Sequence, residues 1–240
     1  MSIEKRVFDV LFSTLALAVL WPLFLAIALL IKLEDDGPVF FRQGRVGHRG
    51  RLFRIWKFRT MVTDPALHGV PLTVGEDTRV TRVGRWLRKL KLDELPQLFN
   101  VLTGEMSFVG PRPELPRYVA HYTAAERRVL DLIPGMTGEA SLRYRNESDV
   151  LGLARDPERV FIEAILPEKV QLNLAYGDRA TLWTDCLLIA RTVREVLLPS
   201  ARSAGTRSFK AATSQTGRRD TSPIELETRP TVRLGNCDER

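Results

Sequence analysis

Residues 10–31 read VLFSTLALAVLWPLFLAIALLI and contain no charged side chain. A helix needs about 20 apolar residues to cross the roughly 30 Å hydrocarbon core of a bilayer. Large apolar side chains would cover every side of this helix, which disfavours a buried core helix. The run also exceeds the apolar region of a signal peptide, and no small-residue cleavage motif follows Ile31. We therefore predict a membrane segment, with a cleaved signal peptide and a core helix as less favoured alternatives.

The charges that flank this segment bear on its path through the membrane. Lys5 and Arg6 precede it, and residues 38–63 after it carry many arginines and no acidic residue. Positive flanks prefer the cytoplasm, so both ends favour the same side. Pro22 lies at mid-segment, where a proline removes a helix hydrogen bond and clashes with the preceding turn. We predict a re-entrant helical hairpin broken at Pro22, and a kinked single span is the alternative.

The composition of the whole chain conceals this segment. The 240 residues have 36 Lys and Arg against 29 Asp and Glu, a formal net charge of +7, and the pI is about 9.8. Such a charge suits nucleic acid, an anionic membrane surface or a phosphorylated substrate. Two cysteines, Cys186 and Cys237, exclude a disulfide-rich scaffold and a cysteine-based zinc site.

Hydrophobic periodicity and turn residues divide the rest of the chain. Residues 39–61 alternate apolar residues with arginines and contain regularly spaced glycines, which predicts a β-hairpin or two short strands. The remainder is predicted to be mainly α-helical, so the fold class is mainly α with a small β-hairpin, as a monotopic membrane protein with interfacial amphipathic helices. The predicted organisation is a membrane helix at 1–36, a folded domain at 37–199, which the residues considered below make the catalytic domain, and a disordered basic tail at 200–240.

Individual helices are expected in five places. A basic amphipathic helix within 79–91 suits a phospholipid surface, and a helix packed on the core is the alternative. Pro96 and Gly104 suit the start and the end of the next helix. The others are expected at 117–133, at 157–176 with an interruption near Pro167, and at 181–198, while 64–77 has a loop composition.

Common catalytic motifs are missing from the sequence. It contains no P-loop, no dinucleotide-binding glycine motif, no zinc-protease motif and no nucleophile elbow. The three histidines are isolated, which disfavours a zinc site. What remains is an adjacent pair of carboxylates, Asp93 and Glu94, between a basic stretch and the helix that begins at Pro96.

This pair has a structural and a chemical interpretation. A carboxylate at a helix start can be a cap worth about 1 kcal/mol. Arginine-bearing turns rich in Gly and Pro, such as residues 110–113, favour the second interpretation because arginine binds phosphate through two parallel hydrogen bonds. Adjacent carboxylates suit divided roles, in which one attacks phosphorus and the other holds Mg²⁺ beside the substrate phosphates.

The sequence resembles the bacterial sugar transferases, the monotopic phosphoglycosyl transferases that begin lipid-linked polysaccharide and glycan assembly. The resemblance covers about residues 4–146. The matching stretches, in the family's order, are Lys5-Arg6-x-x-Asp9, Gly37-Pro38-Val39-x-Phe41-x-Gln43-x-Arg45-x-Gly47, Lys57-Phe58-Arg59-Thr60-Met61, Leu92-Asp93-Glu94-Leu95-Pro96-Gln97-Leu98, Gly110-Pro111-Arg112-Pro113-Glu114 and Pro134-Gly135-x-Thr137-Gly138.

The resemblance implies a reaction and its site residues. Asp93 attacks the diphosphate of a UDP-sugar and releases UMP, and the phosphosugar then passes to a polyprenol (undecaprenyl) phosphate in a ping-pong reaction. The resemblance also implies that Glu94 holds Mg²⁺. Positions near the phosphates correspond to Lys57, Arg59, Arg112 and, in the altered context Arg143-Tyr144-Arg145-Asn146, Arg145.

The same resemblance implies a location and partners. The catalytic domain is expected to face the cytoplasm at the bacterial inner membrane, to initiate exopolysaccharide, capsule, O-antigen or glycan synthesis, and to supply downstream glycosyltransferases. Beyond Asn146 the match fades, so this part of the chain is expected to set sugar preference. A membrane-anchored nucleic-acid-binding protein or a scaffold is the alternative, although neither gives Asp93 and Glu94 a role.

Overall fold

The computed structural model describes residues 2–63 and 77–198. The predicted tail at 200–240 and nearly all of the predicted loop at 64–77 lie outside these ranges. The first element is α1 (Ile3–Glu34), a single helix whose start is capped by the Ser2 side chain. Among the described helices, α1 alone is long and apolar enough to cross a membrane.

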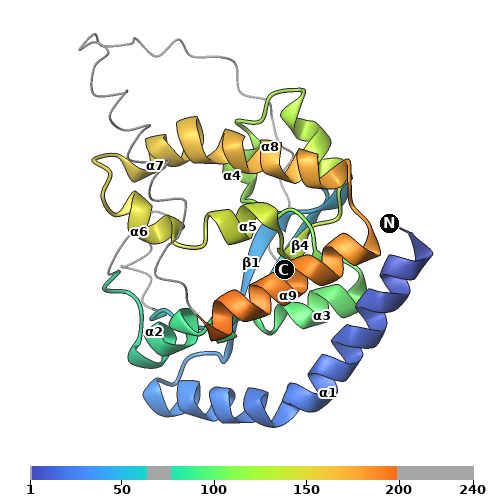
Figure 1. Cartoon of the computed structure of the whole chain (residues 1–240). Coiled ribbons are helices and arrows are strands. Elements are labelled where there is room, and N and C mark those ends of the chain that lie inside the picture. Colours follow the sequence, from blue (N-terminus) through green and yellow to red (C-terminus); the bar gives the residue numbers. More distant parts are fainter. Residues whose placement is uncertain (1, 64–76, 199–240) are drawn as a thin grey trace, which may run out of the picture. The chain divides into compact units, whose positions relative to one another are not determined.

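Pro22 does not break α1. The helix runs continuously through Pro22, so the predicted helix–break–helix is wrong, and Figure 1 shows that α1 instead changes direction partway along its length. A proline removes one backbone hydrogen bond and commonly kinks a helix without ending it. The path of α1 relative to a membrane stays a prediction.

Both ends of α1 are fastened to the same body by polar contacts. At the N-terminal end, Arg6 donates to the backbone oxygens of Val101 (2.7 Å) and Leu102 (2.8 Å), and Asp9 accepts from Ser107 Oγ (3.2 Å) and from the Phe108 backbone N–H (3.2 Å). Val101 and Leu102 lie in the last turn of the helix Gln97–Thr103. Carbonyls at a helix C-terminus lack partners within the helix, so a guanidinium is favourable there.

At the other end of α1, acidic residues make the contacts. Glu34 accepts hydrogen bonds from the backbone N–H groups of Arg82 (2.7 Å) and Val83 (3.1 Å), and Asp35 pairs with Arg59 (2.6 Å). Ile27 and Ile31 are buried in a cluster with Phe58 and Leu87. The two ends of α1 are therefore held by one folded unit.

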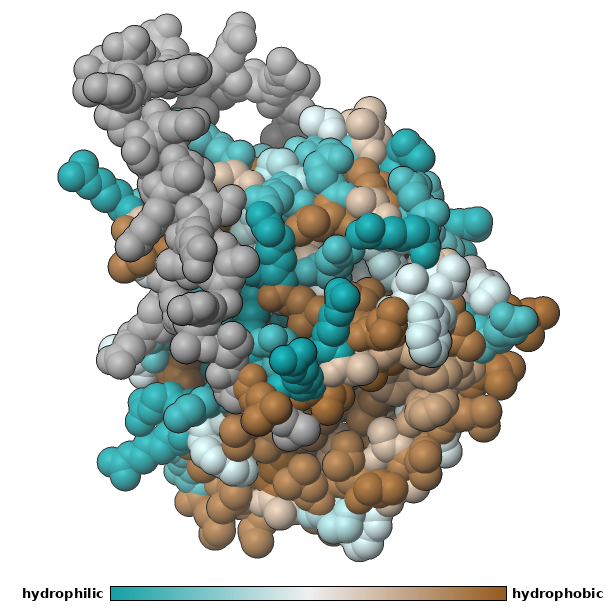
Figure 2. All heavy atoms as spheres, in the orientation of Figure 1, coloured by the Kyte–Doolittle hydropathy of each residue, from teal (hydrophilic) through white to brown (hydrophobic). Residues whose placement is uncertain are grey.

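The middle of α1 presents a wide apolar surface. Figure 2 shows hydrophobic residues gathered along the edge of the molecule where Figure 1 places α1. Monomeric soluble proteins rarely expose such a continuous apolar patch. The exposed side chains are Leu11, Phe12, Leu15, Val19, Trp21, Leu25, Leu29 and Leu30.

The predicted hairpin is confirmed. Strands β1 (Phe40–Val46) and β2 (Leu52–Phe58) pair antiparallel, with Phe41 opposite Lys57, around the short 3₁₀ helix η1 (His48–Gly50). The Phe40 and Phe58 rings stack with centroids 5.3 Å apart. Aromatic cross-strand packing of this kind stabilises a two-stranded sheet that would otherwise be marginal.

Three short elements then lead to the site. They are α2 (Arg82–Lys89), the 3₁₀ turn η3 (Leu92–Glu94) and α3 (Gln97–Thr103). Helix α2 buries Leu87 and exposes Trp86, and Leu90 directly after the helix is also exposed, so the apolar residues of this segment divide between core and surface. The helix expected between Pro96 and Gly104 is confirmed, and Gly104 ends it with φ 87°.

The single helix expected at 117–133 is wrong. The structure has α4 (Pro116–Val119) and a separate 3₁₀ helix, η4 (Glu126–Asp131). Thr123 and Glu126 exchange side-chain-to-backbone hydrogen bonds of 2.8 and 3.3 Å, and this capping box starts a new helical turn. The sequence also gave no hint of the parallel pair β3 (Ser107–Val109) and β4 (Gly135–Thr137).

Helices complete the described chain. The expected interruption near Pro167 takes the form of a π-helical segment, η5 (Phe161–Ile165), which joins α7 (Pro157–Val160) to α8 (Leu166–Gly177) without a gap. The last predicted helix is confirmed as α9 (Leu182–Leu197). The largest core cluster packs α4, η4 and α8 around Tyr118, Phe161 and Ile165. The remaining elements are α5 (Glu139–Arg143) and α6 (Glu147–Leu151).

Candidate active site

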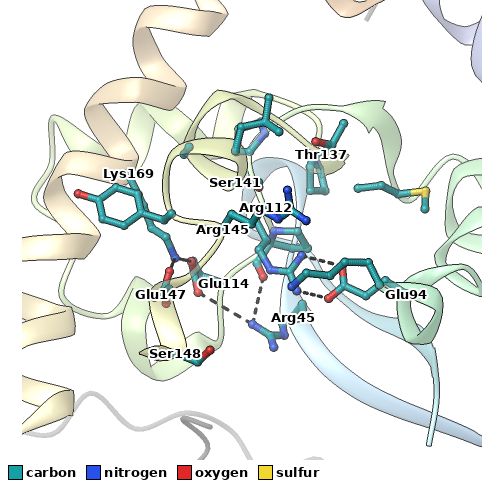
Figure 3. Close-up of a pocket in the computed structure, with 18 of the residues that line it drawn as sticks. Arg45, Glu94, Arg112, Glu114, Thr137, Ser141, Arg145, Glu147, Ser148 and Lys169 are labelled. Carbon is teal, nitrogen blue, oxygen red and sulfur yellow. Dashed lines mark hydrogen bonds and ion pairs between the residues drawn. The ribbon is translucent and has the colours of Figure 1, made fainter. Parts of the chain in front are cut away.

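A cavity of about 1550 Å³ brings most of the predicted site residues together. Its wall draws on β1, β2, η3, the turn after β3, and helices α5, α6, α8 and α9. Figure 3 shows Glu94, Arg112 and Arg145 among the side chains that line it. Asp93 and Lys57 also line this cavity.

Asp93 lies in η3, between α2 and α3. Lys91, just before η3, has φ 57° in the left-handed region, which turns the chain sharply after α2. Asp93 is buried, with 7% of its surface exposed. Burial and the neighbouring Glu94 charge raise the pKa of Asp93, while Lys57, Lys91 and Arg88 oppose this rise.

Glu94 is held by two cationic side chains. Lys57 Nζ donates to Oε1 (2.9 Å), and Arg112 donates to both oxygens, at 2.9 Å for Oε2. Although burial disfavours the ionised form, the charges and hydrogen bonds of Arg112 and Lys57 hold the pKa of Glu94 well below its ordinary value. The two adjacent carboxyls therefore differ in their tendency to bind a proton.

The turn that carries Arg112 is fixed by close backbone packing. The Gly110 N–H donates to the Thr137 oxygen (2.9 Å), and the Gly135 N–H donates to the Pro111 oxygen (2.8 Å). A Cβ at Gly110 or Gly135 would overlap the backbone of the other strand. Only glycine permits this approach, so the rigidity expected for residues 110–113 follows from the β3–β4 pair.

Arg145 reaches the cavity wall and pairs with α9. Its NH1 group donates to the backbone oxygen of Glu195 and lies 3.1 Å from Glu195 Oε2. Arg145 is therefore beside the site, with its charge balanced by a carboxylate from the last helix.

Arg59 is not brought to the cavity. Its guanidinium is buried against Asp35, 2.6 Å away, at the end of α1. Strand β2 ends at Phe58, so the strand alternation that would place Arg59 on the side of Lys57 does not continue. Pro22, predicted as a membrane break, likewise lies in α1 and away from the cavity lining.

Sequence reasoning did not assign a role to several charged residues of the cavity. Arg45 and Glu114 belong to the stretches that match the family, but the match implied no role for either side chain. Glu147 and Lys169 come from α6 and α8, beyond the matching stretches, and nothing in the sequence joined them to the site. The charged lining residues without a predicted role include Arg45, Arg88, Glu114, Glu147 and Lys169.

The carboxylates also bear on metal binding. Within 2–63 and 77–198, no cluster of three or more acidic, histidine or cysteine side chains could hold a metal ion. Mg²⁺, however, is commonly held by one or two carboxylates together with substrate phosphates. Arg112 and Lys57 lower the pKa of Glu94, which favours its ionised form, and its Oε2 accepts a single hydrogen bond from the described residues. The residues present therefore fit a Mg²⁺ ion that arrives with a phosphorylated substrate.

Comparison with known proteins identifies the family. Residues 1–199 match the family described as bacterial sugar transferase. The chain is 40% identical over 198 residues to the UDP-N-acetylgalactosamine-undecaprenyl-phosphate N-acetylgalactosaminephosphotransferase of Aeromonas hydrophila, which covers 80% of this chain and 43% of that protein. The chain thus spans less than half the length of that relative.

Two further relatives are covered more completely. Identity to the exopolysaccharide production protein ExoY of Sinorhizobium fredii is 43% over 211 residues, covering 82% of this chain and 86% of that protein. Identity to the UDP-glucose:undecaprenyl-phosphate glucose-1-phosphate transferase of Caulobacter vibrioides is 39% over 206 residues, covering 81% and 70%. With a family match across residues 1–199 and these relatives, the chain belongs to the bacterial sugar transferase family.

Proposed function

We propose that this chain transfers a sugar 1-phosphate from a UDP-sugar to undecaprenyl phosphate, with release of UMP. The observation that carries the proposal is the buried Asp93 beside a Glu94 that Lys57 and Arg112 hold. Relatives named as undecaprenyl-phosphate sugar phosphotransferases support the substrate class.

The proposed reaction has two displacement steps at one phosphorus atom. An Asp93 carboxylate oxygen attacks the phosphorus that bears the sugar, and the bond to the bridging oxygen breaks to release UMP. A phosphate oxygen of undecaprenyl phosphate then attacks the same phosphorus and releases Asp93. The products are a polyprenyl diphosphate sugar and the original carboxylate, which corresponds to a ping-pong mechanism.

Electrostatics support this assignment of roles. A carboxylate and a diphosphate repel each other, and charge on the transferred phosphoryl group must be stabilised during the reaction. Lys57, Arg112 and Arg145 bring positive charge to the cavity that contains Asp93. Glu94 orients Lys57 and Arg112 through direct hydrogen bonds, so these donors are positioned before a substrate arrives.

Glu94 is the proposed holder of Mg²⁺. When bound, the ion would supply positive charge to the diphosphate. The protein's own residues bind the phosphates and shield the nucleophile from bulk water. They also raise the pKa of Asp93 and lower the pKa of Glu94.

We further propose that α1 enters and leaves the membrane on the cytoplasmic side of the bacterial inner membrane. The contacts at its two ends support this, because Arg6 and Glu34 both bind the body that carries the active site. The apolar middle of α1 would then face lipid, and the cavity would remain close to a lipid-borne acceptor. Transfer of the product to downstream glycosyltransferases would follow at the same surface.

Release of UMP tests the proposal directly. Purified full-length chain is incubated with Mg²⁺, undecaprenyl phosphate and a panel of UDP-sugars, and Asp93→Asn is compared with the wild type. We expect Asp93→Asn to lose at least about 100-fold in rate, because an amide cannot replace the nucleophile. Asp178→Asn makes the same change at an exposed position and should keep full activity. An Asp93→Asn enzyme that retains most activity would exclude the mechanism, and salt-dependent DNA binding without UMP release would favour the nucleic-acid alternative.

A further inference from the structure

A second group of charged residues lies in the same cavity, apart from the pair formed by Glu94 and Arg112. Figure 3 shows the Lys169 ammonium between the carboxylates of Glu114 and Glu147. Lys169 Nζ is 2.5 Å from Glu147 Oε2 and 3.5 Å from Glu114 Oε1. We call these three residues the Glu114–Lys169–Glu147 cluster.

The cluster is a built feature of the cavity wall. Lys169 is 8% exposed, and its ammonium also lies 4.9 Å from the centre of the Phe161 ring. Arg45 joins the cluster to the phosphate-binding side, because its NH1 is 3.9 Å from Glu114 Oε2. The three members come from the turn after residue 113, α6 and α8, and Arg45 adds a contact from β1, so four separate parts of the fold converge here.

The charges of the cluster disfavour a phosphate at this place. Two carboxylates flank one ammonium, and a phosphate dianion would be repelled by both of them. A neutral group with several hydroxyls suits the cluster, because each hydroxyl can donate to a carboxylate and accept from an ammonium. Hydrogen bonds to charged partners are stronger than those between neutral groups.

Unpartnered polar atoms also occur in the lining of this cavity. Among the described residues, the Tyr118 hydroxyl, Arg45 Nε and Ser141 Oγ are buried and have no hydrogen-bond partner. All three residues line this cavity, and Tyr118 is 3% exposed. Because buried polar atoms in proteins nearly always have a partner, three such atoms in the lining of one cavity point to a polar ligand.

We propose that the Glu114–Lys169–Glu147 cluster binds the hydroxyl groups of the donor's sugar ring and discriminates between sugars. This inference rests on the proposed function and assigns one end of its substrate. The diphosphate then lies toward Asp93 and Arg112, and the sugar lies toward α6 and α8. The aromatic rings of Tyr118, Tyr144 and Phe161 also line the cavity and offer apolar surface to the ring carbons.

Sugar discrimination provides a test that a purely structural role would not pass. UMP release is measured for Glu147→Gln with UDP-glucose, UDP-galactose, UDP-N-acetylglucosamine and UDP-N-acetylgalactosamine, and inhibition by UDP is measured in parallel. We expect kcat/KM for the preferred donor to fall at least about tenfold while kcat/KM for its epimer changes less. The ratio of the two kcat/KM values should therefore decrease. The inhibition constant of UDP should change by less than about twofold.

Two further variants make the test decisive. Lys169→Gln should also decrease the ratio of kcat/KM between the preferred donor and its epimer. Thermal unfolding of both variants separates altered sugar recognition from loss of the fold. Glu163→Gln makes the same change as Glu147→Gln at an exposed ion pair and should keep the wild-type preference. An equal loss for every donor would assign the cluster a structural role, and a matching loss of UDP affinity would assign it to the nucleotide. If the wild type releases UMP from no donor, the proposed function itself is refuted. If the wild type is active and both variants keep its donor preference, only the assignment of the cluster to the sugar is refuted.

Discussion

Arg112 donates to both carboxylate oxygens of Glu94, and it does so from a turn held by two glycine-to-carbonyl hydrogen bonds. Lys57 approaches the same carboxylate from β2. The two cations are thus oriented by a side chain that directly follows the proposed nucleophile. A change in this arrangement should alter turnover more than it alters the fold.

Replacement of Arg112 by lysine tests the geometry of this contact. Lysine keeps the positive charge but cannot donate two parallel hydrogen bonds from a planar group. We expect Arg112→Lys to lower kcat/KM for UMP release by about 10- to 100-fold. Arg159→Lys changes an exposed ion pair in the same way and should have no effect. Equal kinetics for the two variants would show that Arg112 supplies charge alone.

The pH dependence of the rate should report Asp93. Burial and the Glu94 charge raise its pKa above the ordinary 3.8, so the carboxyl stays protonated to a higher pH than an exposed Asp. Because the nucleophile must be ionised, the rate should rise with pH through this raised pKa. The measurement is kcat/KM for UMP release across the acidic range.

Two variants give the sign of this effect. Glu94→Gln removes the like charge, so the rise of its residual kcat/KM with pH, the acid limb of the profile, should occur at lower pH. Lys57→Met removes a cation that lowers the pKa of Asp93, so its acid limb should lie at higher pH. Shifts in the same direction for both variants would assign the limb to another group.

Removal of divalent metal tests the proposed role of Glu94. Since the described residues offer no closed metal cluster, the ion should bind weakly and exchange with solvent. We expect EDTA to abolish UMP release and added Mg²⁺ to restore it fully, with no change in the unfolding temperature. Activity that survives EDTA would remove Mg²⁺ from the proposal.

Gly84 offers a test of how closely α2 packs. A Cβ at this position would overlap the Thr60 backbone, although alanine is the better helix former by about 1 kcal/mol. We expect Gly84→Ala to destabilise the protein by about 1–3 kcal/mol and to lower its unfolding temperature. Gly44→Ala, where a Cβ would meet no atom within 4 Å, should leave that temperature nearly unchanged. Stabilisation by Gly84→Ala would contradict the close contact.

Labelling in sealed vesicles tests the path of α1. In a background with Cys186 and Cys237 replaced by serine, a cysteine is placed at position 2 or at position 178. We expect an impermeant reagent to label both positions from the same side, because both ends of α1 bind the body that contains position 178. Labelling of the two positions from opposite sides would establish a single span.

Local signals in the sequence predicted the hairpin and several helix ends. The alternation of residues 39–61 and the left-handed Gly104 act within a few residues, so their outcome does not depend on distant parts of the chain. The capping box of Thr123 and Glu126 is a signal of the same kind, and it would have divided the helix expected at 117–133.

Contacts between distant segments could not be predicted in this way. Strands β3 and β4 have three residues each and pair only because Gly110 and Gly135 allow their backbones to meet. Arg59 lies next to the site in sequence, yet it pairs with Asp35 because β2 ends one residue earlier. Lys169 joins the cavity only through the packing of α8, which no local pattern encodes.

The fastening of α1 at both ends also bears on biogenesis. With Arg6 and Glu34 bound to one folded body, no hydrophilic segment within residues 2–63 and 77–198 has to be carried across the bilayer when α1 enters it as proposed. A protein-conducting channel would then have no polar segment of these described residues to move to the far side. The finished fold could instead insert its apolar helix into one leaflet after release from the ribosome.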